Sequence, residues 1–358
     1  MLRQSHRSTR WERLRPVFPR PMIGDTSPVI KKSQRLWKST IASFSVYLFA
    51  LVGCDLGSTA RREILAIHGH EGIVYGVAFT RDGKSAFSCG LDGFIRSWDL
   101  STGARLKQFG EGGGVGIRDI ALSPDGKKLL SVGMDKVVRL WDIESGKEKR
   151  KLEGHTSAVY RVAFSNDGKS AVSCSADKTV RSWELITGKN RWRFGSSLSS
   201  FGTVYSVAIT PDGGKVLAGC EDKTIRVLDG LSGKQISPLR GHHVAVLCID
   251  VSADGRKAVS SGSGKEILVW DLVTGKHRTL QTGHTGSIRE IAFCPQGNRV
   301  LSGSFDGTLR LQDIRTGSEI LCLKNHHLPV YCVSVSLDGS KALSGDYKGG
   351  VRLWDLRQ

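Results

Sequence analysis

A histidine, a serine and an aspartate, the residue types of an acyl-transfer triad, occur at one spacing in three places of this chain, and in two of these a tryptophan follows at the same distance. These two sets are His70, Ser88, Asp92 and Trp98, and His155, Ser173, Asp177 and Trp183. A nucleophilic serine lies on an exposed turn, but Ser88 and Ser173 each lie in a segment that alternates apolar and polar residues, as strands do. This placement, and the recurrence of the set, favour a structural role, so we expect no catalytic residues.

The second set belongs to a unit that runs from Gly154 to Glu184. Three of its segments have the alternating pattern of strands: Val159 to Phe164, Ser170 to Cys174 and Thr179 to Trp183. Asn-Asp-Gly at 166–168 is a tight hairpin signal between the first two segments. A fourth strand is expected after a turn at 187–188. The unit therefore predicts a four-stranded antiparallel sheet.

The unit recurs seven times with a period of about 42 residues. The position of the tryptophan is occupied in successive units by Trp98, Trp141, Trp183, Leu228, Trp270, Gln312 and Trp354. A Gly-His start and a Trp-Asp end in a repeat of this length are typical of a propeller blade. The chain therefore resembles the WD-repeat β-propeller family over roughly residues 61–358. This resemblance implies an all-β fold, a seven-bladed propeller.

The resemblance also implies a role for the two recurring sets, because in this family His, Asp, Ser or Thr and Trp form a hydrogen-bonded tetrad inside a blade. Each bond is expected to contribute about 1 kcal/mol to stability. In other blades the tetrad is incomplete: the second has no His, the fifth has Gly264 for the Asp, the sixth has Gln312 for the Trp, and the seventh has Lys348 for the Asp. The fourth keeps only Asp222, so we expect it to be the weakest point of the ring.

The ring is predicted to be closed by a segment from the N-terminal side. The last blade reaches Trp354 and Asp355 without a fourth strand of its own. Residues Arg61 to Ile67 precede the first Gly-His and have the position of an outer strand, so they can complete the seventh blade and remove free strand edges. The expected organisation is a leader at 1–53, a short linker at 54–60 and the propeller at 61–358.

The leader carries 10 Lys and Arg against 2 Asp and Glu, and its first part has no period, so we expect disorder there. An apolar run from Ile41 to Gly53 follows, which suits the central region of a signal peptide. The run ends in Leu-Val-Gly-Cys at 51–54, which resembles a bacterial lipobox. This resemblance implies cleavage before Cys54 and lipid attachment to it. We then expect an exported protein, anchored to the membrane on the bacterial periplasmic side.

Other interpretations of the leader stay open. It is long for a signal peptide, and translation from Met22 would shorten it. An uncleaved signal anchor is one alternative. A buried strand of an eighth, partial blade is another, because Cys-Asp-Leu at 54–56 resembles Trp-Asp-Leu at 98–100. Without lipidation, the alternative is a cytoplasmic scaffold.

Charge and cysteine content favour neither a nucleic-acid site nor a metal site. The formal net charge is +18, of which the leader holds +8, and the remainder is spread along the turns of the repeats. Such a spread favours a solvated basic surface over a nucleic-acid patch. Several of the eight cysteines repeat one strand position, which indicates buried thiols, and no two have zinc-ligand spacing. We expect no metal and no cofactor.

Partners of the resembled family most often dock on the face formed by the loops that lead into the first strand and join the second and third strands. Five of the six tyrosines fall in positions that point to this face. Aromatic residues and arginine are enriched at the centres of interfaces. The candidate partner-binding residues are Tyr75, Arg118, Tyr160, Tyr205, Arg289, Phe305, Tyr331 and Tyr347. The alternative is that inward-turned tyrosines fill the central channel.

Two functions of different class follow. The first is a non-enzymatic platform for a protein or peptide, whose arginines favour a segment with at least one carboxylate, because a guanidinium can hold a carboxylate by two hydrogen bonds. The second is an enzyme at the channel mouth, which would need clustered carboxylates or histidines. The only acid in these positions is Glu221, so the sequence predicts the binding platform.

Overall fold

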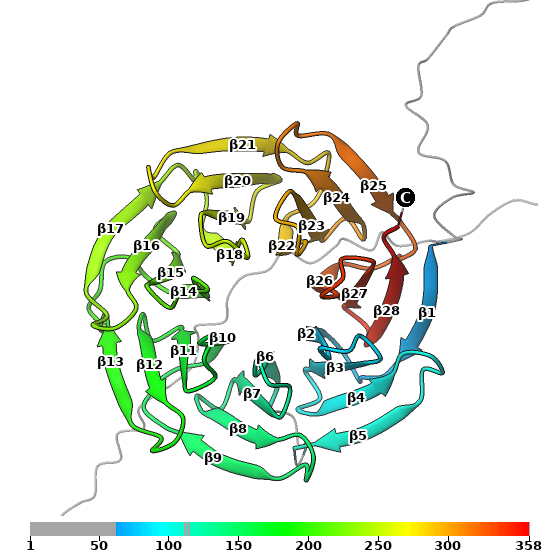
Figure 1. The fold of residues 1–358 in the computed structure, drawn as a ribbon, viewed down its shortest axis with the longest axis horizontal. Helices are drawn as coiled ribbons and strands as arrows, with labels where there is room; N and C mark the ends of the chain where they lie inside the picture. The colour runs from blue at the N-terminus through cyan, green and yellow to red at the C-terminus, as the bar shows by residue number, and fades with distance from the viewer. Residues whose placement is uncertain (1–61, 111, 113–114, 358) are drawn as a thin grey trace, which may run out of the picture. The chain divides into compact units, whose positions relative to one another are not determined.

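The structure, a computed structural model, describes residues 62–110, 112 and 115–357. These residues form 28 strands in seven four-stranded antiparallel sheets, and no helix occurs among them. The sheets follow one another around a common centre in chain order (Figure 1). The predicted all-β, seven-bladed propeller is confirmed.

Blades 1 to 6 are each built from four consecutive strands. Blade 1 contains β2 (Val74–Phe79), β3 (Ser85–Gly90), β4 (Ile95–Asp99) and β5 (Arg105–Phe109). Blade 2 contains β6 (Ile117–Leu122), β7 (Lys128–Gly133), β8 (Val138–Asp142) and β9 (Glu148–Leu152). Blade 3 contains β10 (Val159–Phe164), β11 (Ser170–Ser175), β12 (Val180–Glu184) and β13 (Asn190–Phe194).

The second half of the ring repeats this order. Blade 4 contains β14 (Val204–Ile209), β15 (Lys215–Cys220), β16 (Thr224–Asp229) and β17 (Gln235–Arg240). Blade 5 contains β18 (Val246–Val251), β19 (Lys257–Gly262), β20 (Glu266–Asp271) and β21 (His277–Gln281). Blade 6 contains β22 (Ile288–Phe293), β23 (Arg299–Ser304), β24 (Leu309–Asp313) and β25 (Glu319–Leu323).

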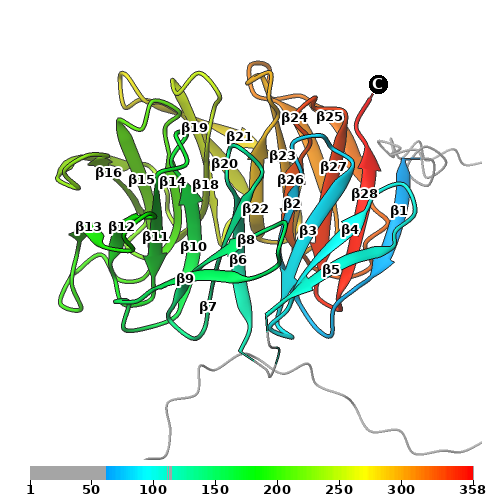
Figure 2. The same cartoon turned by 60° about the horizontal axis from the view of Figure 1, so that its bottom comes forward.

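Blade 7 joins the two ends of the propeller. Its strands are β26 (Val330–Val335), β27 (Lys341–Asp346) and β28 (Gly350–Asp355), completed by β1 (Glu63–His68). β1 runs antiparallel to β28, with Leu65 opposite Leu353 and Ile67 opposite Val351. β1 and β28 lie side by side in both views of the ring (Figures 1 and 2). The predicted closure by an N-terminal strand is therefore confirmed, with the strand beginning and ending slightly later than expected.

The position of a strand in its blade decides which side chains it carries. Second strands are covered on both faces, and β3 and β11 are buried at every position after the first. They are accordingly small and apolar in sequence. Fourth strands face solvent, and β5 and β9 are exposed at four of five positions. Their lysines and arginines can therefore remain hydrated.

The hydrophobic core is shared between neighbouring blades. Trp98 of blade 1 lies in one cluster with Leu343 and Val351 of blade 7. Trp141 of blade 2 packs on Phe109 of blade 1, with ring centroids 6.2 Å apart. Because each cluster needs two blades, no blade can bury its apolar faces alone.

Repeated strand positions also bury thiols, as the sequence predicts. Burial raises the pKa of each of these thiols, so they stay protonated. These six cysteines are Cys89, Cys174, Cys220, Cys248, Cys294 and Cys332, and Cys322 is buried as well.

The predicted leader, the linker and the proposed lipidation site at Cys54 lie outside the described residues. Within the part of the chain that the structure describes, no helix is long and apolar enough to span a bilayer.

Candidate functional site

The tetrad of blade 3 is a continuous chain of hydrogen bonds from the aspartate to the tryptophan. His155 Nδ1 lies 2.8 Å from Asp177 Oδ2, and His155 Nε2 lies 2.8 Å from Ser173 Oγ. The indole of Trp183 donates to the same Ser173 oxygen at 2.8 Å. Ser173 is fully buried, so no substrate can reach its hydroxyl. The set resembles a hydrolytic triad in composition, but its geometry serves the blade.

The electrostatics of this tetrad favour an ionised aspartate and a neutral histidine. Burial raises the pKa of Asp177, but hydrogen bonds from His155 and Thr179 outweigh it and hold the pKa well below its ordinary value. Burial lowers the pKa of His155, and Asp177 offsets this only in part. A histidine held neutral donates from Nδ1 to the carboxylate and accepts from the serine at Nε2. The predicted tetrad of blade 1 is likewise joined, by contacts of 2.7–2.9 Å among His70, Asp92, Ser88 and Trp98.

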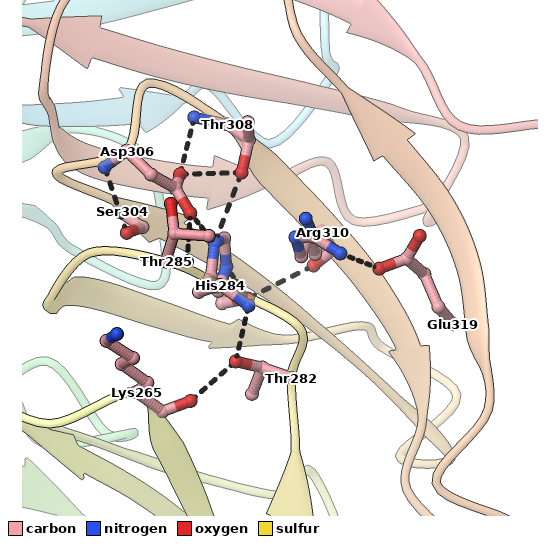
Figure 3. Close-up of polar contacts among 10 residues, drawn as sticks. Lys265, Thr282, His284, Thr285, Ser304, Asp306, Thr308, Arg310 and Glu319 are labelled. Atoms are coloured by element: carbon pink, nitrogen blue, oxygen red, sulfur yellow. Dashed lines mark hydrogen bonds and ion pairs between the residues drawn. The ribbon is translucent and has the colours of Figure 1, made fainter. Parts of the chain in front are cut away.

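Blade 6 keeps the histidine side of the tetrad without the tryptophan. His284 Nδ1 lies 2.9 Å from Asp306 Oδ2, and the Thr308 hydroxyl donates to the other carboxylate oxygen at 2.7 Å (Figure 3). Gln312 fills the tryptophan position, and its amide nitrogen donates to the carbonyl oxygen of Gln281 at 3.0 Å. Its buried Oε1 has no hydrogen-bond partner among the described residues. Losing the indole thus leaves one polar atom unsatisfied.

The prediction that blade 7 lacks the tetrad aspartate is wrong. Asp346, at the end of β27, lies 3.2 Å from His326 Nδ1 and accepts hydrogen bonds of 2.9 Å from the backbone of Lys348 and Gly350. Lys348 itself is exposed. A Cβ at Gly350 would collide with the Asp346 carboxylate, so glycine there makes room for it. The acid comes from a position two residues earlier than in other blades.

Blades 5 and 4 replace the missing tetrad groups differently. His242 has no carboxylate beside it, and burial, together with repulsion from His277 and His243, lowers its pKa to about 4. Blade 4 has neither the histidine nor the tryptophan. There Phe201 is buried and stacks on Phe194, with ring centroids 5.4 Å apart.

The predicted partner-binding positions on the first strands coincide with a β-bulge in every blade. The register of each first strand shifts at its second residue, which is left unpaired. A bulge redirects the side chain of the extra residue. The bulge residues are Tyr75, Arg118, Tyr160, Tyr205, Leu247, Arg289 and Tyr331. The bulges therefore place one side chain per blade at the mouth of the channel.

These side chains contact one another across blade boundaries. Tyr205 and Tyr160 have ring centroids 5.5 Å apart. Arg118 lies over Tyr160 at 5.6 Å and over Tyr75 at 4.4 Å. Tyr75 in turn meets Tyr331 edge to face at 5.9 Å. Four consecutive blades and the seventh are thus linked at the mouth.

The contacts continue through blades 7 and 6. Tyr331 lies 5.1 Å from Phe305 and 6.1 Å from Tyr347, measured between ring centroids. Arg289 lies over Phe305 at 5.3 Å and over Tyr331 at 5.6 Å. All eight predicted residues therefore belong to one connected set, which we call the aromatic–arginine belt. Blade 5 contributes Leu247, which no such contact joins to the belt.

The two arginines of the belt have no counter-ion. Neither Arg118 nor Arg289 forms an ion pair or hydrogen bond with any described residue, and the Nε of each is buried without a partner. Burial lowers the pKa of Arg289; Tyr331 opposes this, while the positive charges of Arg161 and Arg118 lower it further. Cation–π contacts with the flanking rings provide part of the missing stabilisation.

A charged cluster that the sequence analysis missed lies one residue further along the same strands. Arg161 contacts Asp119 at 3.4 Å and also pairs with Glu290, which belongs to a blade across the channel. Burial raises the pKa of Asp119, and Arg161 offsets this in part. The three side chains line a central cavity of about 200 Å³. Comparing the residue after each bulge position would have revealed the cluster.

Both carboxylates of this cluster are occupied, which limits the chemistry they can perform. Asp119 also accepts a hydrogen bond of 3.0 Å from the backbone of Val162. Among the described residues, no group of three or more His, Cys, Asp and Glu is placed to hold a metal ion. The arrangement is therefore suited to holding the blades together beneath the mouth.

Comparison with protein families agrees with this geometry. The model of the WD domain, G-beta repeat (WD40) matches seven stretches, at residues 61–99, 104–142, 146–184, 193–229, 233–271, 275–313 and 317–355. A search of curated proteins finds no match.

Proposed function

Because this chain belongs to the WD40 repeat family, whose propellers generally bind proteins or peptides, we propose that it is a non-enzymatic scaffold that holds a protein or peptide segment on the aromatic–arginine belt. Fold alone does not decide function, so the proposal depends on the chemistry of the belt. Tyrosines offer a flat apolar body and one hydroxyl at low entropic cost.

The uncompensated charge of Arg118 and Arg289 is the observation that carries the proposal. Two guanidinium groups close enough to repel each other have aromatic neighbours but no carboxylate among the described residues. A carboxylate from outside would satisfy their free N–H groups by two parallel hydrogen bonds. We therefore expect a short acidic or mixed segment to cross the mouth, and no nucleic-acid partner.

The same region argues against an enzyme and leaves plugging as the competing role. The carboxylates of Asp119 and Glu290 beneath the mouth are paired with Arg161. Glu221 accepts a hydrogen bond of 2.8 Å from the Thr203 backbone, and the tetrad serines are buried. The tyrosines could instead serve to fill the channel. Phe305 and Tyr347 remain 39% and 47% exposed, however, which favours a surface that still has contacts to make.

A peptide test with the full-length chain separates these roles. Matched heptapeptides that carry two glutamates or two glutamines are titrated against the wild type, Tyr160→Ala, Tyr331→Ala and the control Leu247→Ala, and melting temperatures are recorded in parallel. Binding predicts a preference for glutamate and a loss of about 2 kcal/mol of binding free energy, the hot-spot scale, in the tyrosine variants only. Unchanged affinity in both would exclude the belt. A large fall in melting temperature would favour plugging.

Location is a separate proposal, supported by the leader sequence. We propose that the protein is exported and lipid-anchored through Cys54, with an uncleaved leader on a cytoplasmic scaffold as the alternative. Radiolabelled fatty acid should be incorporated into the wild type but not into Cys54→Ser, and the wild type should sediment with membranes. A wholly soluble wild type with an intact leader would exclude the anchor.

A further inference from the structure

A pocket lies between blades 3 and 4, at the end of the blades opposite the belt. It is beside the turns that join the first and second strands of each blade. Its volume is about 700 Å³, within the range of small-molecule sites. It is lined by the turns at 165–167 and 211–214, the turn at 229–231, and strands β11, β12 and β15. We call it the inter-blade pocket. Nothing in the proposed function uses it.

Two of the residues that line the pocket are glycines at positions where other blades have side chains. The residue two after the tryptophan position is Gly230 here, but in the other blades it is Leu100, Ile143, Leu185, Leu272, Ile314 and Leu356. The residue after the first turn is Gly214, where other blades have Lys, Arg, Asn or Ser. The Gly230 amide still donates to the Gly214 carbonyl at 3.0 Å, as Leu185 does to Lys169 in blade 3. This backbone hydrogen bond is kept, but a Cβ at Gly230 would lie 1.9 Å from the carbonyl oxygen of Gly213, so the backbone here comes closer than a side chain would allow.

The deep end of the pocket is apolar with one hydroxyl. Val172, Val216 and Ser182 line it and are 3%, 1% and 3% exposed. The Ser182 hydroxyl has no hydrogen-bond partner among the described residues. Five other blades have Leu or Val at this position. The Ser182 oxygen is not fully enclosed by protein atoms, so it opens on the pocket and can form a hydrogen bond with a polar atom of a ligand.

The outer end of the pocket is negatively charged. Asp167, Asp212 and Asp229 each use Oδ1 to accept bonds inside their own turns, from the hydroxyls of Ser165, Thr210 and Ser232 at 2.5–2.6 Å. No Oδ2 of the three has a partner among the described residues. The turn hydrogen bonds lower the pKa of all three carboxyls, so they stay ionised at neutral pH. Arg191 is the one cation among the lining residues.

We propose that the inter-blade pocket binds a small organic cation in which a primary ammonium group is joined by an aliphatic chain to a neutral polar group, as in a linear amino alcohol. The ammonium group meets the carboxylates at the outer end, and the chain lies against Val172 and Val216. The far polar group bonds to Ser182. A lysine side chain from a protein would bring its ammonium group to the apolar end instead, so a free small molecule fits better.

Titration of the full-length chain with 6-amino-1-hexanol tests whether the pocket selects a cation. We expect saturable binding with a dissociation constant of about 1 mM. The matched anion 6-hydroxyhexanoate should not saturate, and n-hexylamine, which lacks the hydroxyl, should bind more weakly. A lysine-containing tripeptide separates the two sources of an ammonium group. Stronger binding of the tripeptide, equal binding of the anion, or no saturation by the amino alcohol would overturn the proposal.

Two variants with matched controls test whether the ligand binds in the inter-blade pocket. Ser182→Leu introduces the residue of blade 2 and should weaken binding at least tenfold, whereas Ser97→Leu, at the same position of blade 1, should not. Gly214→Lys introduces the residue of blades 1 to 3 and should abolish binding by charge, whereas Ser340→Lys should not. Because lysine is native at this position in three blades, Gly214→Lys is expected to fold. Wild-type affinity in both test variants would place the site elsewhere.

Discussion

Arginines at two adjacent levels of the channel have opposite surroundings. At the mouth, Arg118 and Arg289 lie between aromatic rings and have no acid beside them. One residue further along the first strands, Arg161 pairs with Asp119 and Glu290 from two other blades. The same residue type therefore lies in two environments, which the presence or absence of a counter-ion distinguishes.

The difference teaches how to separate a structural charge from a binding charge. An arginine that is paired with carboxylates of the same protein already has its partners. Removing it leaves those carboxylates buried without a counter-ion. An arginine stacked on rings keeps its N–H groups available for an external acid. The lower level should therefore govern stability, and the upper level should govern affinity.

Replacing Arg161 should give the largest effect on stability. Arg161→Leu leaves Asp119 and Glu290 without their cation, and we expect a loss of about 3–5 kcal/mol in the free energy of unfolding. Urea denaturation of the variant and the wild type measures it. A loss no larger than that of Arg118→Leu would remove the distinction between the two levels.

The pH dependence sharpens this result. Burial already raises the pKa of Asp119 above its ordinary value, and without Arg161, which lowers it, this pKa should rise further above that of the unfolded chain. A raised pKa stabilises the folded state at low pH, and the stabilisation is lost as pH rises through the folded pKa. The loss in the free energy of unfolding that Arg161→Leu causes should therefore become smaller as the pH falls from about 7 to about 5. A loss that is constant or grows on acidification would contradict this account.

The mouth arginines should give the largest effect on affinity. Arg118→Gln together with Arg289→Gln should weaken binding of the glutamate peptide by about 2–3 kcal/mol, the range for hydrogen bonds to charged groups and interface hot spots. Its affinity should then equal that of the glutamine peptide. The comparison of the two peptides is the control, and a preserved glutamate preference would show that other cations bind the partner.

A smaller loss of stability is expected when only one acid of the lower level is changed. Glu290→Gln removes one charge but leaves Arg161 paired with Asp119, so about 1–2 kcal/mol should be lost. Denaturation at neutral pH measures this change. Glu153→Gln, the same acid-to-amide change at an exposed position, is the control for a general charge effect.

The smallest effect is expected for stability at the mouth. Arg118→Leu should change the free energy of unfolding by at most about 0.5 kcal/mol, because it leaves no carboxylate unpaired and removes a partly buried guanidinium whose Nε has no partner. Thermal melting at low and high salt would measure it. A loss comparable with that of Glu290→Gln would mean that the belt supports the ring.

The repeat of the tryptophan position was enough to predict seven sheets and the strand that closes them. Alternation and turn signals act locally, so a single sequence can reveal them. The belt residues could also be found, because the tyrosines recur at one position in register. What the sequence did not indicate is that this position is a β-bulge, since bulges depend on pairing with the neighbouring strand.

Two misses have a common physical cause. Asp346 takes the place of an acid expected two residues later, and only the backbone course past Gly350 allows it. Arg161 and Glu290 come together from blades 3 and 6, a contact that no local pattern encodes. Contacts set by the course of the backbone or by the closing of the ring are therefore beyond a reading based on repeat positions alone.

Closure by β1 also determines how the ring carries mechanical load. The chain enters β1 at Glu63, opposite Trp354, at the end of the blade that lies away from the mouth. Tension between the leader and a partner held at the mouth pulls β1 along its own axis, so the β1–β28 hydrogen bonds are sheared together. Tension between Glu63 and the C-terminal end of β28 would instead part them one after another, like a zipper. The pairing of β1 with β28 is therefore strongest in the direction in which a tethered scaffold would be pulled.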